Sequence, residues 1–461
     1  MIHQLEPIAA LATAPGVGAI AVVRVSGEGA IALVNRLFRG KDLTQQPSHT
    51  AHFGTFRTAA GTLIDEVLVT VFRSPKSFTK EDVVEISCHG SEYIIRQILT
   101  ELTRASDLGQ ARLAKPGEFT QRAFLNGQFD LVQAEAVADV IVADSAASHR
   151  AALSQLRGGF SKQLKDLRQQ LIDFVALVEL ELDFGEEDVE FAKRDQLRQL
   201  MQAIRAVIGP LIASFSAGNV IKNGVPTVIV GKPNAGKSTL LNALLNEEKA
   251  IVSDIPGTTR DVIEDELFID GIRFRLIDTA GLRDTTDTIE ALGVERTRQQ
   301  MEKAALVLYL FDGATTTPDE LRDMIRELDE SGKPYVLVGN KADATSDGKR
   351  QTLNAVAAGI LWISAKDAQI DELKAALSAQ VRTNTALQTG SAVVTSARHL
   401  QHLTATDDAL ARALSALDAG TSADWLAMDL RVALRELGEL TGEVTTDDLL
   451  DSIFSRFCIG K

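Results

Sequence analysis

Residues 231–239, with the sequence GKPNAGKST, constrain the fold of this chain more than any other segment. They match the pattern G-x-x-x-x-G-K-[ST], follow the apolar run TVIV and precede the helix-forming run LLNALLN. A strand, a glycine-rich turn and a helix in this order form a phosphate-binding loop, because backbone N–H groups and a helix N-terminus then face the phosphates. Lys237 can reach the β- and γ-phosphates, and the Ser238 hydroxyl suits Mg²⁺.

Residues 224–380 support a nucleotide-binding α/β domain, because short apolar strands and helical stretches alternate along them. The expected strands are VPTVIVG, FRLIDTAG, ALVLYLFDG, PYVLVGNKAD and ILWISAK. Such alternation is typical of a parallel sheet covered by helices on both faces.

Two further motifs predict which base is bound. In NKAD (340–343), Asp343 can accept hydrogen bonds from guanine N1–H and N2–H₂, which adenine does not offer in that arrangement. Asn340 would brace the loop, and the stem of Lys341 would pack on the base. In SAK (364–366), the Ala365 N–H can meet guanine O6. In this order after a phosphate loop, the motifs predict GTP rather than ATP.

Two loops are the expected switches, ordered by the γ-phosphate and released on hydrolysis. In DTAG (278–281), Asp278 would hold Mg²⁺ through water, and the Gly281 N–H would meet the γ-phosphate. In PGTTR (256–260), Thr259 would be the second hydroxyl ligand of Mg²⁺. The residues expected to bind GTP are Asn234, Ala235, Gly236, Lys237, Ser238, Thr239, Ser253, Thr258, Thr259, Asp278, Thr279, Ala280, Gly281, Asn340, Lys341, Asp343, Ser364, Ala365 and Lys366.

The residue after DTAG is Leu282, and an apolar side chain cannot orient the attacking water as glutamine does in Ras-like GTPases. Another group must do so, and the residues alone leave several candidates open. They are Arg283, Asp284, Asp287 and Glu290. No arginine finger is evident in the sequence, so a monovalent cation near the phosphates, close to the side-chain oxygen of Asn234, would supply part of the positive charge.

The flanking regions differ in pattern. Residues 1–125 read as mixed α/β, with strands at 18–27 and 64–72 and helical spacing at 91–105. Apolar residues at steps of three and four from Leu156 to Val178 predict one long helix, and the acidic run 186–190 predicts a turn. Helical spacing resumes at about 390. We therefore expect domains at 1–127, 128–222, 223–385 and 386–461, with the α/β domain inserted into one helical bundle.

Composition limits the class of protein. The chain has 461 residues, of which 45% are hydrophobic, and two cysteines, Cys88 and Cys458, so we expect no disulfide framework and a reducing, cytoplasmic location. No signal peptide is evident, and no membrane association is expected, because no apolar stretch reaches the roughly 18 residues of a membrane span. A net charge of −15 argues against non-specific nucleic-acid binding but allows a local basic patch.

The ending FCIGK has a cysteine fourth from the end, but Gly460 and Lys461 fit a prenylation signal poorly.

Taken together, the segments resemble one family over essentially the whole chain, the tRNA-modification GTPases MnmE (TrmE). The most specific segments are AVVRVSG, SFTKEDVVEISCHG, KPGEFTQRAFLNGQFDLVQAEAVADVI and the ending FCIGK. The resemblance implies a multidomain fold, α/β plus all-α. An N-terminal domain similar to folate-binding modules would form a homodimer, and a helical domain would be interrupted by a Ras-like GTPase domain.

The resemblance also implies an activity. Members of this family hydrolyse GTP and act with an FAD-dependent partner, MnmG, in a heterotetramer. Together they add an aminomethyl or carboxymethylaminomethyl group to C5 of the wobble uridine of certain tRNAs, with 5-formyl- or methylene-tetrahydrofolate as the one-carbon donor.

Several residue roles follow from the same resemblance. The catalytic carboxylate would be Glu290, and Mg²⁺ would be bound by Ser238 and Thr259. Cys458 would lie beside the modification chemistry, with a buried small hydrophobic role as the alternative. The implied K⁺ ligands are Asn234, Ser253, Ile255 and Thr258. The implied folate contacts are Arg24, Glu85, Lys461 and Gln128, the last at a position where the family usually has lysine.

Two other functions remain open from the sequence. A regulatory GTPase in ribosome assembly would carry an RNA-binding domain with a Gly-x-x-Gly loop and basic flanks, and the region after 390 lacks that signature. A folate-dependent transferase with a merely structural GTPase domain would not need the intact switch motifs.

Overall fold

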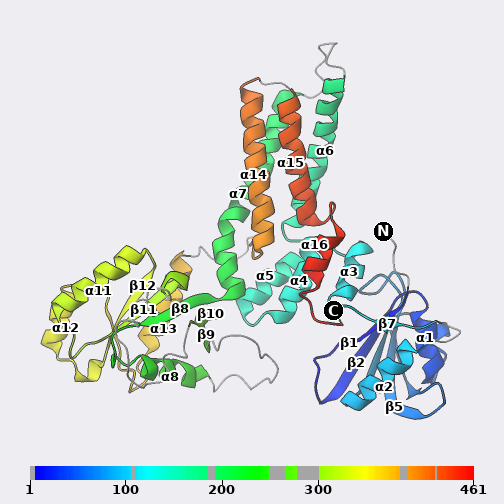
Figure 1. Ribbon diagram of the computed structural model, residues 1–461, viewed down its shortest axis with the longest axis horizontal. Helices are drawn as coiled ribbons and strands as arrows, with labels where there is room; N and C mark the ends of the chain where they lie inside the picture. Colours follow the sequence, from blue (N-terminus) through cyan, green and yellow to red (C-terminus); the bar gives the residue numbers. More distant parts are fainter. Residues whose placement is uncertain are drawn as a thin grey trace. The chain divides into compact units, whose positions relative to one another are not determined.

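The computed structural model describes residues 6–104, 109–183, 193–248, 265–277, 301–384, 393–420 and 423–460 (Figure 1). It divides into two compact units. Unit 1 comprises Met1–Val142, Ala152–Gly209 and Gln401–Lys461, and unit 2 comprises Ala143–Ala151 and Pro210–Leu400. The four domains expected from the sequence are a finer division than these units and stay a prediction.

The N-terminal part of unit 1 is built on a seven-stranded sheet with the strand order β3-β4-β5-β6-β2-β1-β7. Every neighbouring pair is antiparallel except β1 and β7, which are parallel. The strands are β1 (Ile8–Leu11), β2 (Gly18–Ser26), β3 (Phe38–Arg39), β4 (Thr50–Arg57), β5 (Leu63–Phe72), β6 (Val83–Gly90) and β7 (Arg112–Leu113). Helices α1 (Ala30–Leu37) and α2 (Glu92–Thr103) accompany them. The strands and the helix expected in this region are confirmed.

The core beneath this sheet is formed by every second side chain along its strands. In β5, Val67, Val69 and Val71 are buried, whereas Leu68 between them is 44% exposed. Successive side chains of a strand point to opposite faces, so one face of β5 packs into the core and the other does not. The buried face packs in one hydrophobic cluster with Ile98 of α2.

Helices make up most of the remaining described residues of unit 1. They are α3 (Glu118–Leu125), α4 (Leu131–Val142), α5 (Ala146–Leu156), α6 (Ser161–Asp183), α7 (Arg194–Asn223), α14 (Ala397–Asp418), α15 (Ala423–Thr441) and α16 (Asp447–Phe454), some of which continue into unit 2. Helices α6, α7, α14 and α15 run alongside one another (Figure 1), and ion pairs join α7 to α14 and α14 to α15. Segments before and after the α/β domain therefore share one bundle, as expected.

The single helix expected from Leu156 to Val178 is wrong. Helix α5 ends at Leu156 and α6 begins at Ser161. Between them, Gly158 and Gly159 have φ angles of 97° and 30°, which lie outside the right-handed helical region. The spacing of apolar residues continues across the break because Phe160 is buried. That spacing does not reveal that two adjacent glycines interrupt the helix. The acidic run 186–190 lies outside the described residues.

Unit 2 contains a six-stranded sheet with the order β13-β12-β11-β8-β10-β9. Only β9 runs antiparallel to its neighbour. The strands are β8 (Val225–Val230), β9 (Asp265–Ile269), β10 (Ile272–Leu276), β11 (Leu306–Asp312), β12 (Tyr335–Asn340) and β13 (Leu361–Trp362), and the helices are α8 (Lys237–Glu248), α11 (Pro318–Ser331), α12 (Asp347–Asn354) and α13 (Asp371–Asn384). The α/β expectation is confirmed.

Strand β8 shows that both faces of this sheet are covered. Ile229 belongs to one hydrophobic cluster, and its neighbours Val228 and Val230 belong to the other. Because alternate residues of a strand face opposite sides, a continuous apolar run such as VIV requires apolar partners on both faces. The phosphate loop therefore starts from a strand that is covered on both faces.

The sequence analysis expected no apolar stretch long enough to cross a membrane, but helix α7 is long and apolar enough to do so. Among the described helices it is the one that passes by length and composition, with a mean hydropathy of 1.5 over 18 residues, of which 28% are buried. Core helices pass the same test, and α7 contributes Met201, Ile204 and Ile208 to the buried interior. Its Arg205 forms an ion pair with Asp407 of α14. The helix is therefore weak evidence for a membrane span.

Candidate functional site

The nucleotide motifs of unit 2 gather at one edge of its sheet. The phosphate loop follows Val230, the last residue of β8; Asn340 is the last residue of β12, and Ser364 lies two residues after β13. These three strands belong to the parallel part of the sheet, so their carboxyl ends lie at the same edge. Ligands of doubly wound sheets bind at that edge.

The phosphate loop has the backbone shape that its glycines require. Gly236 has a φ of 97°, and a Cβ built on it would lie 2.2 Å from Asn340 Nδ2. Asn234 adopts a left-handed φ of 60° and is exposed. Helix α8 begins at Lys237, so Ser238 and Thr239 lie in its first turn. The helix N-terminus thus follows directly from the loop, as anion binding requires.

Lys237 is held across this loop. Its Nζ donates to the carbonyl oxygens of Gly231 at 2.8 Å and Lys232 at 2.9 Å. Burial lowers the pKa of the Lys237 ammonium, because a charged group is less stable away from water. A phosphate oxygen at the loop would restore the favourable interactions of that charge.

Asn340 joins the phosphate motif to the base motifs. Its Nδ2 donates to the carbonyl oxygen of Ala235 at 2.8 Å, and its Oδ1 accepts from the Ala365 N–H at 3.1 Å. The residue is 3% exposed, so both hydrogen bonds are shielded from water. The bracing role expected of Asn340 corresponds to these contacts. The sequence predicts that guanine O6 accepts from the Ala365 N–H. It would therefore have to share that donor with Asn340 Oδ1 or displace Asn340 from it.

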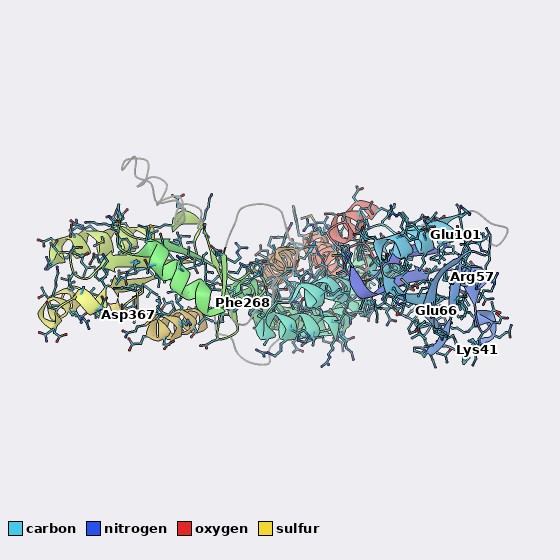
Figure 2. The ribbon with its side chains drawn as sticks, turned by 90° about the horizontal axis from the view of Figure 1, so that it is seen from below. Lys41, Arg57, Glu66, Glu101, Phe268 and Asp367 are labelled. Carbon is cyan, nitrogen blue, oxygen red and sulfur yellow. The ribbon has the colours of Figure 1, made fainter. Side chains whose placement is uncertain are left out.

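Asp343 lies at the open side of the same site. It is exposed, and its Oδ1 lies 3.1 Å from the Ser364 hydroxyl. The same hydroxyl contacts Oδ2 of Asp367 at 2.7 Å; Asp367 is labelled in Figure 2. The hydroxyl has one hydrogen, so it orients one of these carboxylates at a time. The Asp343 carboxylate therefore remains accessible to hydrogen-bond donors of a base.

Lys341 is positioned by a strand that was not expected to contribute. Its φ is 58°, and its Nζ lies 2.7 Å from Oδ2 of Asp312 at the end of β11. Burial acts to raise the pKa of Asp312, but the hydrogen bonds from Lys341 and the Ala314 N–H outweigh it and lower that pKa. The ion pair thus holds the stem of Lys341 at the sheet edge. The sequence feature that could have identified Asp312 as a site residue is its position at the end of a predicted strand.

Part of the predicted site lies outside the described residues. These positions are Ser253, Ile255, Thr258, Thr259, Asp278, Thr279, Ala280, Gly281, Glu290 and Lys461. The donors that are described fit the expected ions: the Ser238 hydroxyl is a hard oxygen of the kind that Mg²⁺ takes, and the exposed Asn234 amide offers an oxygen suited to K⁺. No distance to a second ligand of either ion is described.

A second cluster in unit 1 brings together two predicted folate residues. Arg24 of β2 and Glu85 of β6 are direct cross-strand partners. Both guanidinium contacts reach Glu85 Oε1, from Nη2 at 2.8 Å and from Nε at 2.9 Å. The guanidinium carbon also lies 5.7 Å from the centre of the Phe119 ring. Sequence reasoning missed Phe119, although it is part of the family segment KPGEFTQ.

The C-terminal tail, residues 455–460, reaches this cluster. Arg24 Nη1 donates to the carbonyl oxygen of Gly460 at 3.3 Å. Ile459 pairs with Pro116 in an isolated bridge, and the Gly117 N–H donates to the Cys458 carbonyl at 3.3 Å. Gly460 is buried with a φ of 94°, and a Cβ there would lie 2.1 Å from the Leu11 carbonyl oxygen. The tail is therefore seated against the N-terminal sheet domain.

The two cysteines differ in environment. Cys458 is exposed, so the alternative of a buried small hydrophobe is wrong. Cys88 is buried, and burial raises the pKa of its thiol to about 11, which leaves it protonated and unreactive. Of the two, only Cys458 is accessible for chemistry.

Gln128 is less closely tied to the cluster. It is exposed, and its N–H donates to the Ala123 carbonyl at 2.8 Å. Among the described residues, no hydrogen bond joins Gln128 to Arg24, Glu85 or Gly460. Its expected role in folate binding stays a prediction.

Comparison with known proteins gives two family matches. The model described as "MnmE helical domain" matches residues 131–458, and the model described as "GTP-binding protein TrmE N-terminus" matches residues 7–128. The first spans the whole inserted α/β domain and most of the chain.

Full-length relatives agree with these matches. The "tRNA modification GTPase MnmE" of Cytophaga hutchinsonii is 56% identical over 460 residues, covering 100% of this chain and 98% of the relative. The protein of the same name from Salinibacter ruber is 49% identical, with 100% of both chains covered. Among solved structures, the FeoB G-domain of Methanococcus jannaschii is 25% identical over 34% of this chain and 98% of that chain, with a TM-score of 0.26, which does not establish a shared fold.

Proposed function

The chain belongs to the MnmE (TrmE) family of tRNA modification GTPases, and from this membership we propose that it hydrolyses GTP to drive the modification of tRNA. The contact that best supports this function is made by Asn340, which links the phosphate loop at Ala235 to the base-recognition segment at Ala365. A site in which these two halves are joined by one buried side chain selects a nucleotide by base and phosphate together.

The finer proposal concerns the reaction. With the FAD-dependent partner MnmG, the protein modifies C5 of the wobble uridine, and a tetrahydrofolate derivative supplies the carbon. The cluster at Arg24 supports it: a cation, a carboxylate and the seated tail meet there, and the exposed Cys458 lies two residues from Gly460. When bound, the folate would supply the one-carbon unit, and Arg24 would hold its polar or anionic groups.

The experiment that tests the function is nucleoside analysis of tRNA from a strain that lacks this chain. We expect loss of the aminomethyl and carboxymethylaminomethyl uridines, with restoration by the wild-type gene. Normal wobble uridines together with an accumulation of immature ribosomal subunits would instead favour the regulatory GTPase in ribosome assembly.

Within the GTPase site, we propose that Glu290 activates water, because Leu282 cannot. Ser238 and Thr259 would hold Mg²⁺, which neutralises phosphate charge when bound. Asn234, Ser253, Ile255 and Thr258 would hold K⁺, which adds positive charge near the phosphates and favours pairing of two GTPase domains in the homodimer.

Hydrolysis should depend on K⁺. We expect GTP turnover at least tenfold faster in KCl than in NaCl at equal ionic strength, because Na⁺ is too small for the same set of oxygens; a tenfold rate corresponds to about 1.4 kcal/mol of barrier. The variant Asn234→Gly should remove this preference. Glycine adopts the left-handed φ of 60° without strain, so the variant removes the amide oxygen and leaves the loop shape. Equal wild-type rates in the two salts would contradict the proposal.

A further inference from the structure

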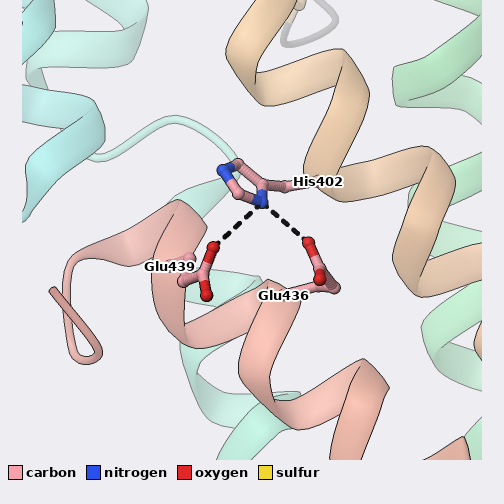
Figure 3. Close-up of side chains that lie close together, drawn as sticks. All are labelled: His402, Glu436 and Glu439. Carbon is pink, nitrogen blue, oxygen red and sulfur yellow. Dashed lines mark hydrogen bonds and ion pairs between the residues drawn. The ribbon is translucent and has the colours of Figure 1, made fainter. Parts of the chain in front are cut away.

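Three side chains on two helices of unit 1 converge on one point, and none of them belongs to either cluster described above. His402 lies on α14, and Glu436 and Glu439 lie three residues apart on α15, on the same helical face. His402 Nδ1 is 2.9 Å from Glu436 Oε2 and 3.9 Å from Glu439 Oε2 (Figure 3). The three ligand atoms all lie within 4.8 Å of one another. We propose that His402, Glu436 and Glu439 form a binding site for a divalent transition-metal ion that clips α14 to α15.

The spacing of the three atoms suits one metal ion. Zn²⁺ binds imidazole nitrogen and carboxylate oxygen at about 2.0–2.2 Å, which places tetrahedral ligand atoms about 3.3 Å apart. The two contacts to His402, at 2.9 Å and 3.9 Å, lie on either side of that value. Small rotations of the two glutamates would equalise them. For Nδ1 of His402 to bind the metal, the hydrogen now shared with Glu436 has to leave that nitrogen: a neutral imidazole then carries its hydrogen on Nε2, and a protonated one gives a proton to water.

Burial and charge favour a cation at this point. His402 is 8% exposed, and the side chains of Glu436 and Glu439 are 13% and 32% exposed. Two carboxylates face one imidazole, so the cluster is negative when His402 is neutral. A bound cation would offset this negative charge.

Arg435 orients both carboxylates from outside. Its Nη2 lies 2.9 Å from Glu436 Oε1, and its Nε lies 3.7 Å from Glu439 Oε1. The other oxygen of each carboxylate, Oε2, is the one turned toward His402. Ligand carboxylates are commonly held by such outer hydrogen bonds. The partly exposed Glu439 leaves a side for the ion and a water molecule to enter, as in three-ligand zinc sites.

The test is a titration of the full-length, nucleotide-free protein, first treated with a chelator and then dialysed, with Zn²⁺ and separately with Mn²⁺. By calorimetry we expect one ion per chain in the wild type, with a rise in Tm. Glu439→Gln should weaken binding about tenfold or more and abolish the rise in Tm. This variant leaves the His402–Glu436 hydrogen bond in place, so its fold is expected to be intact.

The matched control is Asp429→Asn. Asp429 of α15 is buried and accepts a hydrogen bond from Arg412 of α14 at 2.8 Å, so the variant weakens an ion pair between the same two helices outside the cluster. It should lower the Tm without changing metal affinity. A wild-type chain that binds neither ion at 100 µM would overturn the proposal, as would unchanged affinity in both Glu439→Gln and His402→Gln, which would place the ion elsewhere.

Discussion

Replacing Asp343 with asparagine should lower the affinity for GTP by about two to three powers of ten and raise the affinity for xanthosine triphosphate. In the proposed site the Asp343 carboxylate would accept from guanine N1–H and N2–H₂, whereas an asparagine amide would place an N–H₂ donor opposite the guanine N2–H₂ donor. A site built to hydrogen-bond one group rejects a partner that leaves its polar groups unpaired. Xanthine has a carbonyl oxygen at position 2, so it restores the pairing. Competition binding with the three triphosphates of guanosine, xanthosine and adenosine measures the change.

The control for this variant is Asp367→Asn. Both carboxylates contact the Ser364 hydroxyl, Asp343 at 3.1 Å and Asp367 at 2.7 Å, but only Asp343 belongs to the NKAD motif. The Asp367 variant should change GTP affinity severalfold at most. If Asp343→Asn bound GTP as tightly as the wild type, or if the wild type bound ATP equally well, the assignment of Asp343 to the base would be wrong.

Replacing Arg24 with glutamine should abolish tRNA modification while leaving GTP binding unchanged. The guanidinium contacts Glu85 and the Gly460 carbonyl, so its loss removes the donor that joins the sheet to the tail and the cation expected to hold the folate. Truncating one partner of a buried, charged hydrogen bond costs about 2–5 kcal/mol, which corresponds to about a thirtyfold or larger loss of affinity. Because Arg24 is about a quarter exposed, the lower end of this range applies. Equilibrium binding of 5-formyl-tetrahydrofolate measures this loss.

A second arginine of the same sheet provides the comparison. Arg57 of β4, labelled in Figure 2, donates to the Gly61 carbonyl at 3.0 Å and makes no described contact with the tail. Arg57→Gln should retain folate affinity and modification. Wild-type folate affinity in Arg24→Gln would exclude Arg24 from the folate site, whatever happened to the modified nucleosides.

How well a contact could be predicted depends on how far apart its residues lie in the sequence. The phosphate loop, its strand and its helix are neighbours in the chain, so their order in GKPNAGKST was enough. The contact of Asn340 with the phosphate loop spans 105 residues, yet it was predictable because NKAD begins at the end of a strand in the same parallel sheet, at the edge where the phosphate loop also lies. Arg24 and Glu85 were assigned to one site only through the family resemblance, and their pairing across β2 and β6 was not predicted, since nothing in either strand indicates the register.

The features that the sequence did not predict have two physical causes, the backbone conformation at glycines and the packing of elements against one another. The apolar pattern continues across Gly158 and Gly159, because periodicity indicates which side chains are buried and carries no information on the backbone φ angles of the residues between them. The use of the Ala365 N–H by Asn340 could not be read from either motif separately, because it depends on how closely β12 and β13 pair. Likewise, the convergence of His402 with Glu436 and Glu439 depends on how α14 packs against α15, which no single helix pattern specifies.

The contact between Arg24 and Gly460 spans 436 residues, which has a consequence for biosynthesis. Domains generally fold in order as the chain leaves the ribosome, so the first sheet can form long before its last partner is translated. The cluster around Arg24 is therefore completed only after Gly460 has been translated. A product cut short by a premature stop after the GTPase segment would keep the residues of the nucleotide site and lack the tail that contacts Arg24.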